Sequence, residues 1–181
     1  MEFDDEFTED VESEIPEETD GYEDFCHAML EQNSDLSEAD LEALWTPAGE
    51  RDYMQTELVD LLRHPEYEGQ RSILTDLETG KAVMDENGEF VECPRNTKGA
   101  QRPDGMLVDD TGVHLREAKN YGDLHNLMDN IAEQTAKREA AWGSDVDITY
   151  VVEPRFTIGE AEKLQAYVED ELGKNLEFPL K

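Results

Sequence analysis

An α/β fold is predicted from the order of the segments along the chain. After an acidic N-terminal stretch, the hydrophobic pattern runs helix, strands, helix, strand, helix. Residues 146–152 form an apolar, β-branched run typical of buried strands, and residues 124–142 carry apolar side chains at helical spacing. Segments that alternate in this way build a sheet with helices packed on it.

The N-terminal quarter is expected to be an acidic arm with short helices. Residues 1–20 are predicted to lack structure, because so acidic a stretch cannot bury enough apolar surface to offset the entropy of ordering. Helical spacing of apolar residues predicts a helix over 22–30. A second helix follows, capped by Ser34 or Ser37, and a third is predicted over 50–63.

The remaining three quarters hold the predicted strands and two longer helices. These helices, over 124–142 and 158–172, each end at a glycine, the residue most favoured after a helix C-terminus. Residues 93–105 are predicted to be irregular. Strands are predicted over the ranges 72–75, 82–84, 90–91, 106–108, 113–119, 146–152 and 176–180.

Negative charge dominates the composition. The chain has 47 Asp and Glu against 15 Lys and Arg, a net charge of −32. Residues 1–45 hold 18 acids and no base, residues 46–93 hold 12 acids and 4 bases, and residues 94–181 hold 17 acids and 11 bases. This balance is typical of a halophilic protein, whose charges are screened in molar salt. A solvating tail and a DNA-mimicking arm are the alternatives.

Several classes of protein are excluded by what the sequence lacks. No stretch approaches the roughly 18 apolar residues that span a bilayer, and the N-terminus does not resemble a signal peptide, so we expect a cytoplasmic protein. Cys26 and Cys93 are expected to be free thiols. The histidines share no ligand spacing, and no glycine motif for dinucleotides or nucleoside triphosphates is present.

Three residues at one end of a predicted hairpin are the candidate catalytic residues. Asp104 precedes the hairpin, and Glu117 and Lys119 end its second strand. Because side chains alternate along a strand, Glu117 and Lys119 share one face, while Arg116 and Ala118 point to the other. Asp104 and the Glu117–Lys119 pair are therefore expected to converge at one end of the hairpin.

The turn of this hairpin sets which residues face each other. A three-residue turn would place Asp109 opposite Val113 and Gly105 opposite Glu117. Asp104 would then lie at the end of the strand, beside Glu117.

These groups suit a divalent cation. The carboxylates of Asp104 and Glu117 and the backbone carbonyl of Ala118 form an all-oxygen ligand set of the kind that Mg²⁺ or Mn²⁺ prefers. Lys119 could orient or deprotonate an attacking water, or balance charge on a phosphate. Alternatively, Asp104 is a turn residue, and Glu117 and Lys119 form an exposed cross-strand ion pair.

The run Pro103-Asp104, twelve residues, then Glu117-Ala118-Lys119 resembles the signature of the PD-(D/E)xK nuclease superfamily. The resemblance covers residues 50–152 and is closest to restriction-like and polymorphic-toxin nuclease domains. It implies a restriction-endonuclease-like core, a central mixed β-sheet flanked by helices. It also implies a Mg²⁺-dependent or Mn²⁺-dependent endodeoxyribonuclease, with DNA as partner. The implied domains are the acidic arm, 1–45, and a nuclease-like domain, 46–181.

The resemblance adds residues from two helices. An upstream acid commonly joins such sites, and Glu57 is the first candidate here, with Glu50 the second. Gln134 resembles the glutamine that such nucleases carry on the following helix, and Arg138 lies one turn beyond it, so both could reach the phosphate backbone. The plainer interpretations are a solvated helix acid and ordinary contacts on the flank of a helix.

A basic loop offers contacts for nucleic acid despite the net charge. Arg95, Lys98 and Arg102 lie between Pro94 and Pro103, where no acid occurs. They are the candidate phosphate contacts, and a flexible surface loop is the alternative interpretation.

A rival function belongs to another class of protein. A degenerate nuclease fold, or an acidic mimic of DNA, would bind a partner without catalysis. In a third hypothesis the acidic arm restrains the nuclease until a regulatory partner or high salt displaces it. A homodimer, and an inhibitory partner for the arm, stay open.

Overall fold

The computed structural model describes residues 14–179 of the chain. Five α-helices and four strands lie in that range. None of these described helices is long and apolar enough to cross a membrane. The chain divides into two compact units, Met1–Thr46 and Pro47–Lys181.

The first unit contains two helices, α1 (Glu14–Gln32) and α2 (Glu38–Trp45). The Trp45 ring lies against those of Tyr22 and Phe25, with centroids 5.5 and 5.2 Å apart. Of the two predicted caps for α2, the structure uses Ser37. Its hydroxyl accepts the Asp40 N–H, while the Asp40 carboxylate accepts the Ser37 N–H.

Helix α1 is longer than the predicted helix over 22–30. The prediction that residues 1–20 lack structure was wrong for residues 14–20, which are helical, and residues 1–13 lie outside the described residues. Pro16 falls in the first turn of α1, where a missing backbone N–H breaks no helical hydrogen bond. The acidic composition is therefore compatible with a helix that begins earlier.

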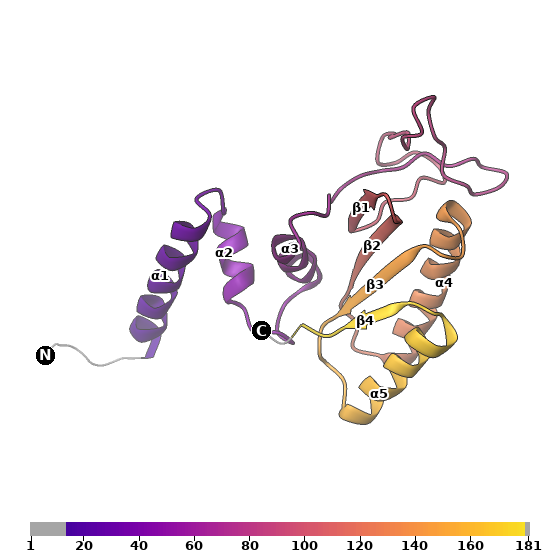
Figure 1. The fold of residues 1–181 in the computed structure, drawn as a ribbon. Helices are drawn as coiled ribbons and strands as arrows, with labels where there is room; N and C mark the ends of the chain where they lie inside the picture. The colour runs from indigo at the N-terminus through magenta and orange to yellow at the C-terminus, as the bar shows by residue number, and fades with distance from the viewer. Residues whose placement is uncertain (1–13, 180–181) are drawn as a thin grey trace, which may run out of the picture. The chain divides into compact units, whose positions relative to one another are not determined.

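The second unit is built on a four-stranded mixed sheet in the order β1-β2-β3-β4 (Figure 1). Strands β1 and β2 are antiparallel, whereas β2, β3 and β4 run parallel. This confirms the predicted α/β class with a mixed sheet. The bounds of the strands are Gly105–Asp109 (β1), Gly112–Lys119 (β2), Asp147–Val152 (β3) and Asn175–Glu177 (β4).

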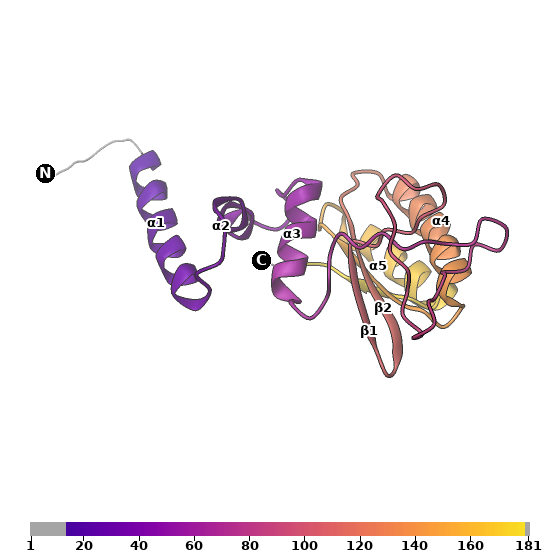
Figure 2. The same ribbon diagram turned by 90° about the horizontal axis from the view of Figure 1, so that it is seen from above.

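Helices cover both faces of this sheet (Figures 1 and 2). Helix α3 (Tyr53–Arg63) lies on one face, and α4 (Leu124–Trp142) and α5 (Ile158–Ala166) lie on the other. A π-helical turn, Tyr167–Glu171, continues α5, so the predicted helix over 158–172 changes geometry near its end. The helix predicted over 50–63 begins at Tyr53, because the Asp52 side chain caps it by accepting the Gln55 N–H at 2.8 Å.

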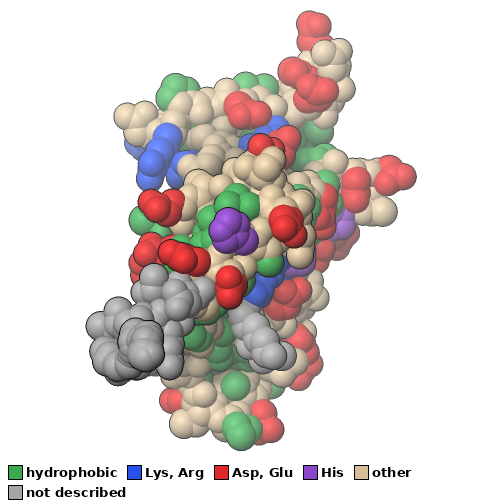
Figure 3. Space-filling model, turned by 90° about the vertical axis from the view of Figure 1, so that its left-hand side faces the viewer, with side chains coloured by type: hydrophobic (Ala, Val, Ile, Leu, Met, Phe, Trp, Pro, Cys, Tyr) green, Lys and Arg blue, Asp and Glu red, His purple; other side chains and the backbone are tan. Residues whose placement is uncertain are grey.

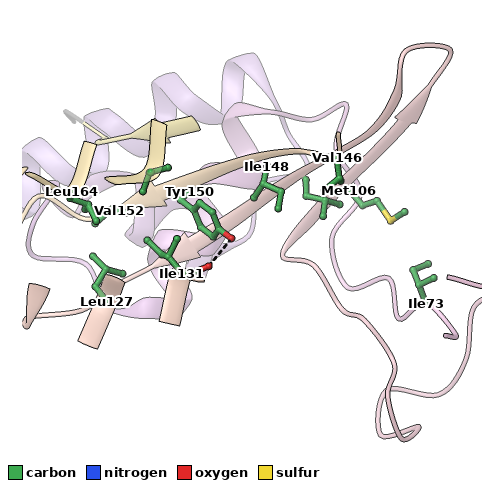
Figure 4. Close-up of a cluster of buried hydrophobic side chains, with 11 residues drawn as sticks. Ile73, Met106, Leu127, Ile131, Val146, Ile148, Tyr150, Val152 and Leu164 are labelled. Atoms are coloured by element: carbon green, nitrogen blue, oxygen red, sulfur yellow. Dashed lines mark hydrogen bonds between the residues drawn. The ribbon is translucent and has the colours of Figure 1, made fainter. Parts of the chain in front are cut away.

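The main core lies between the sheet and the helices α4 and α5. Tyr150 of β3 is fully buried there, and its hydroxyl bonds to Thr135 at 2.6 Å and donates to the Ile131 carbonyl at 3.4 Å (Figure 4). Further buried members of this core are Leu115, Leu127, Ile148, Val152, Leu164 and Val168. The core fixes β2 and β3 against α4.

The long segment between α3 and β1 is mostly irregular. The strands predicted over 72–75, 82–84 and 90–91 form isolated bridges instead of continuous ladders. Ile73 is buried and bridges to both Glu92 and Gln101. Pieces this short form few ladder bonds with one another, so they fold back on themselves, while Glu68 at the start of the segment bridges to Met106 of β1.

The register of the β1–β2 hairpin differs from the prediction by one residue. Asp109 pairs with Gly112 and Gly105 pairs with Arg116, whereas pairs with Val113 and Glu117 were predicted. The turn has two residues instead of three, and the Asp109 carboxylate stabilises it by accepting the N–H of Thr111 at 2.9 Å. As a result, Asp104, the residue just before β1, lies opposite Glu117.

Candidate active site

Alternation along β2 places Glu117 and Lys119 against helix α4. The Glu117 carboxylate accepts a hydrogen bond from Arg138 Nε at 2.8 Å, and Lys119 Nζ donates to Asn130 Oδ1 at 2.6 Å. Arg116, between them in number, faces the other way and bonds to Asp60 of α3. The predicted alternation of faces is confirmed. Both site residues are buried, so they are not an exposed cross-strand ion pair.

Asp104 joins these residues where β1 stops. Its Oδ2 accepts the Ala118 N–H at 2.8 Å, and its own N–H donates to Glu117 Oε1 at 3.3 Å. The Asp104 side chain thus continues the hydrogen bonding of the hairpin one step past the strand. Because the N–H and C=O of one strand residue point to the same side, the Ala118 carbonyl faces the same edge.

Helix α3 adds two side chains that lie one turn apart. The Tyr53 hydroxyl donates to the Asp104 carboxylate, 3.0 Å from Oδ1 and 3.2 Å from Oδ2. Glu57 is half-buried, and burial followed by the charge of Asp104 raises its pKa to about 7. Glu50, the second candidate acid, is exposed and precedes the helix. Of the two candidate acids, Glu57 is thus the one on α3, where the charge of Asp104 acts on it.

Burial sets the electrostatics of this group. Desolvation raises the pKa of Asp104 and of Glu117, against the opposing effects of the Ala118 N–H on Asp104 and of Arg138 on Glu117. Desolvation also lowers the pKa of Lys119. Carboxylates crowded in a poorly solvated place are costly to keep ionised, and a divalent cation would offset that cost.

Three polar residues of α4 line the face that meets β2. Asn130, Gln134 and Arg138 are spaced by four and so lie along one side of the helix. Arg138 is buried and also donates to Gln101, so its guanidinium holds Glu117 instead of facing solvent, where a phosphate would bind. Gln134 lies between the other two, and its buried Oε1 accepts no hydrogen bond from the described residues.

The predicted basic loop reaches the site through one residue. Arg102 donates to Gln70, and its charge lowers the pKa of the nearby Glu57, against the effect of burial. Arg95 and Lys98 are exposed, and neither contacts the acids in the part of the chain that the structure describes. Of the three bases, Arg102 lies closest to the candidate chemistry.

A buried network that the sequence did not reveal anchors the start of α3. Glu153, fully buried at the end of β3, accepts hydrogen bonds from Gly49 N at 2.6 Å and from the Thr56 hydroxyl at 3.1 Å. Asn120 Nδ2, just past Lys119, donates to the Arg51 carbonyl at 2.7 Å. The only hint in the sequence is an acid directly after a buried strand.

A second group of potential metal ligands lies beside the sheet. Asp60, His64 and Glu177 place one ligand atom each within 4.8 Å of the others, the only such group among the described residues. However, Arg116 donates to both oxygens of Asp60 and to Glu177 at 2.5 Å. Arg116 already pairs with both carboxylates, so the group is explained as an ion-pair network.

The acids of the candidate active site are spaced more widely than this group. That spacing is compatible with Mg²⁺, which usually keeps several waters and binds through one or two carboxylates. Asp104 and Glu117 would supply those carboxylates, and Glu57 would act through a bound water.

Comparison of the chain with protein-family models, with curated proteins and with solved structures finds no match. The resemblance to PD-(D/E)xK nucleases therefore depends on the segment from Pro103 to Lys119 and on the geometry around it.

Proposed function

We propose that the protein is a metal-dependent nuclease of the PD-(D/E)xK type that hydrolyses phosphodiester bonds in DNA. The observation that carries the proposal is the convergence of Asp104, Glu117 and Lys119 at one end of the β1–β2 hairpin. An acid from α3, Glu57, joins them. This is the set of groups that the resemblance implied, drawn from separate segments.

The residues present fit a hard divalent cation. Asp104, Glu117 and the Ala118 carbonyl would hold Mg²⁺ or Mn²⁺, because these ions favour oxygen ligands. When bound, such an ion acidifies a water and offsets the negative charge that develops on the phosphate.

Lys119 would orient or deprotonate the attacking water. Asn130 holds its Nζ in place, and burial lowers the pKa of Lys119, which increases the share of the amine that is unprotonated and able to take a proton from water. Arg138 keeps Glu117 Oε2 engaged, which leaves Oε1 on the side of Asp104. Each of these two helix residues is thus a positioning residue for one member of the site.

The net charge is compatible with this function because it is unevenly distributed. Residues 1–45 carry 18 acids and no base, whereas residues 94–181 carry 17 acids and 11 bases. Acidic side chains are spread widely over the face drawn in Figure 3. Such a surface suits a protein that works at high salt, where screening lets nucleic acid approach.

The acidic first unit favours a second candidate function. Eighteen acids without a single base could mimic a phosphate backbone, either toward a basic partner or as a restraint on the nuclease itself. Cleavage rates with and without residues 1–45 test the restraint, which predicts faster cleavage after deletion.

The proposed activity is tested by cleavage of plasmid and single-stranded DNA with MgCl₂, MnCl₂ or EDTA. Assays at about 0.15 M and about 1 M NaCl cover screening lengths of roughly 8 and 3 Å. We expect metal-dependent cleavage that falls by about 10²-fold or more in Asp104→Asn and Lys119→Met. The asparagine still accepts the Ala118 N–H, so the fold is retained.

Asp110→Asn is the matched control, because Asp110 is an exposed acid at the tip of the same hairpin. This variant should cleave DNA as the wild type does. Absence of metal-dependent cleavage under every condition, or equal cleavage by the variants and the wild type, would refute the proposed activity.

A further inference from the structure

The aromatic ring of Tyr53 lies at the edge of the candidate active site. Tyr53 is the first residue of α3, and its hydroxyl is fixed by both oxygens of Asp104. The residue is nevertheless 46% exposed, and the adjacent Met54 is 77% exposed. The polar end of the ring is therefore held at the site while much of its apolar surface faces solvent.

Packing within the unit does not account for this placement. Tyr53 belongs to neither the buried core nor the layer of partly buried residues around it. In the part of the chain that the structure describes, no other aromatic ring stacks on it. The capped first turn of α3 fixes the backbone of Tyr53, and the hydroxyl bonds to Asp104, so the ring is presented beside the residue proposed to bind the cation.

The charge of the protein limits how else it could hold nucleic acid. Residues 46–181 combine 29 acids with 15 bases, and several of those bases are taken up by buried pairs such as Arg116–Asp60 and Arg138–Glu117. Phosphate contacts by the remaining bases would also weaken as salt rises. Stacking of a base on an aromatic ring contributes roughly 1–3 kcal/mol and needs no charge.

We propose that Tyr53 is a stacking platform for an unpaired nucleobase next to the scissile phosphate. The substrate is then single-stranded nucleic acid or an unpaired end, because a base inside a duplex has both faces covered by its neighbours. This inference rests on the proposed nuclease function for its chemistry, but the binding that it describes can be measured without cleavage.

The experiment measures binding of a fluorescent single strand and of its duplex by anisotropy, with CaCl₂ in place of MgCl₂ and gels to verify that the DNA is intact. Three proteins are compared: the wild type, Tyr53→Phe and Tyr53→Ala. The phenylalanine keeps a stacking ring and loses only the hydroxyl, so it is the matched control. Urea midpoints of the two variants verify that both are folded.

We expect Tyr53→Ala to weaken single-strand binding by about 5-fold to 150-fold, which is the stacking range converted to a ratio of dissociation constants. Tyr53→Phe should stay within about 2-fold of the wild type, and duplex binding should change little in either variant. The ratio between Tyr53→Ala and the wild type should also persist from about 0.15 M to about 1 M NaCl, since stacking is not ionic. An RNA strand of the same sequence distinguishes ribose from deoxyribose substrates.

The outcomes separate the two proposals. Equal loss in Tyr53→Phe and Tyr53→Ala, equal loss for duplex and single strand, or no loss at all overturns the stacking role, even if the protein cleaves DNA. Tyr53-dependent binding of single strands without any metal-dependent cleavage supports the platform and removes the nuclease.

Discussion

Arg116 and Glu117 are adjacent in β2, yet they belong to opposite faces of the sheet. Arg116 donates to Asp60 of α3 at 2.9 Å, while Glu117 accepts from Arg138 of α4 at 2.8 Å. Each helix is thus tied to β2 by a buried ion pair. The pair on the α3 face has no proposed part in chemistry, so its role is to hold α3 in position.

Removing Asp60 tests that role. Asp60→Ala leaves Arg116 buried with only Glu177 as an acidic partner. Breaking a buried pair typically costs 3–5 kcal/mol, and we expect about 3 kcal/mol here because Glu177 remains. The free energy of unfolding by urea at fixed NaCl measures the cost.

Asp129→Ala is the control for Asp60→Ala, since it removes the same charge from an exposed position on α4. A loss of less than about 1 kcal/mol in Asp60→Ala, the range of an exposed pair, would contradict the structural role.

Residue-scale prediction from sequence is confirmed for the faces of β2, which the periodicity of the strand alone decides. Asp104, Glu117 and Lys119 follow from alternation and from a recognisable spacing. The role of Tyr53 and the pairing of Arg138 with Glu117 were missed, because both depend on which helix lies on which face of the sheet. The spacing of Tyr53 to Glu57, one helical turn, was the available signal.

The start of α3 matters most at the scale of elements. Asp52 caps the helix together with Gln55, the Tyr53 hydroxyl in the first turn donates to Asp104, and Glu57 lies one turn later. The buried network around Glu153 fixes the chain just before this cap. A shift of the helix start would therefore move an acid and a ring of the site together.

Asp52→Ala tests the cap. We expect a loss of about 1 kcal/mol in the free energy of unfolding by urea, because the N–H of Gln55 loses its acceptor. Metal-dependent cleavage should fall as well, since Glu57 would be held less firmly.

Asp52→Ser removes the same charge and keeps a capping oxygen, so its stability and cleavage should stay close to wild type. Equal behaviour of the alanine and serine variants would assign the effect to charge instead of capping.

Helices were easier to predict than strand pairing. Helix α4 has the predicted bounds, because its apolar spacing and the glycine after it are local signals. The hairpin register was wrong by one residue, since it depends on a side chain: Asp109 closes a two-residue turn. The short pieces over 72–91 had strand composition without a neighbour to extend the ladder.

At the scale of the whole molecule, repulsion between negatively charged side chains is the main unfavourable contribution to folding that the composition reveals. A net charge of −32 on 181 residues opposes a compact state at low ionic strength. The screening length falls from about 10 Å at 0.1 M salt to about 3 Å at 1 M, which removes most of this repulsion.

We expect the urea midpoint to rise as NaCl increases from about 0.1 M to about 1 M. Most of the rise should occur in the lower part of that range, where the screening length changes fastest. Circular dichroism follows the transition, and equimolar sucrose controls for general exclusion of cosolvent from the surface. A midpoint that is constant or falls with NaCl would show that repulsion does not limit stability.

The hairpin that carries the site also restricts how the chain could change in length. Adding one residue inside β2 would rotate every later side chain to the opposite face and send Glu117 toward α3 and away from Arg138. Adding residues at Asp110-Thr111 would lengthen only an exposed tip. We therefore expect insertions and deletions to be tolerated at the turn of this hairpin. Within β2 a change of one residue would turn the side chains of the candidate site to the wrong face.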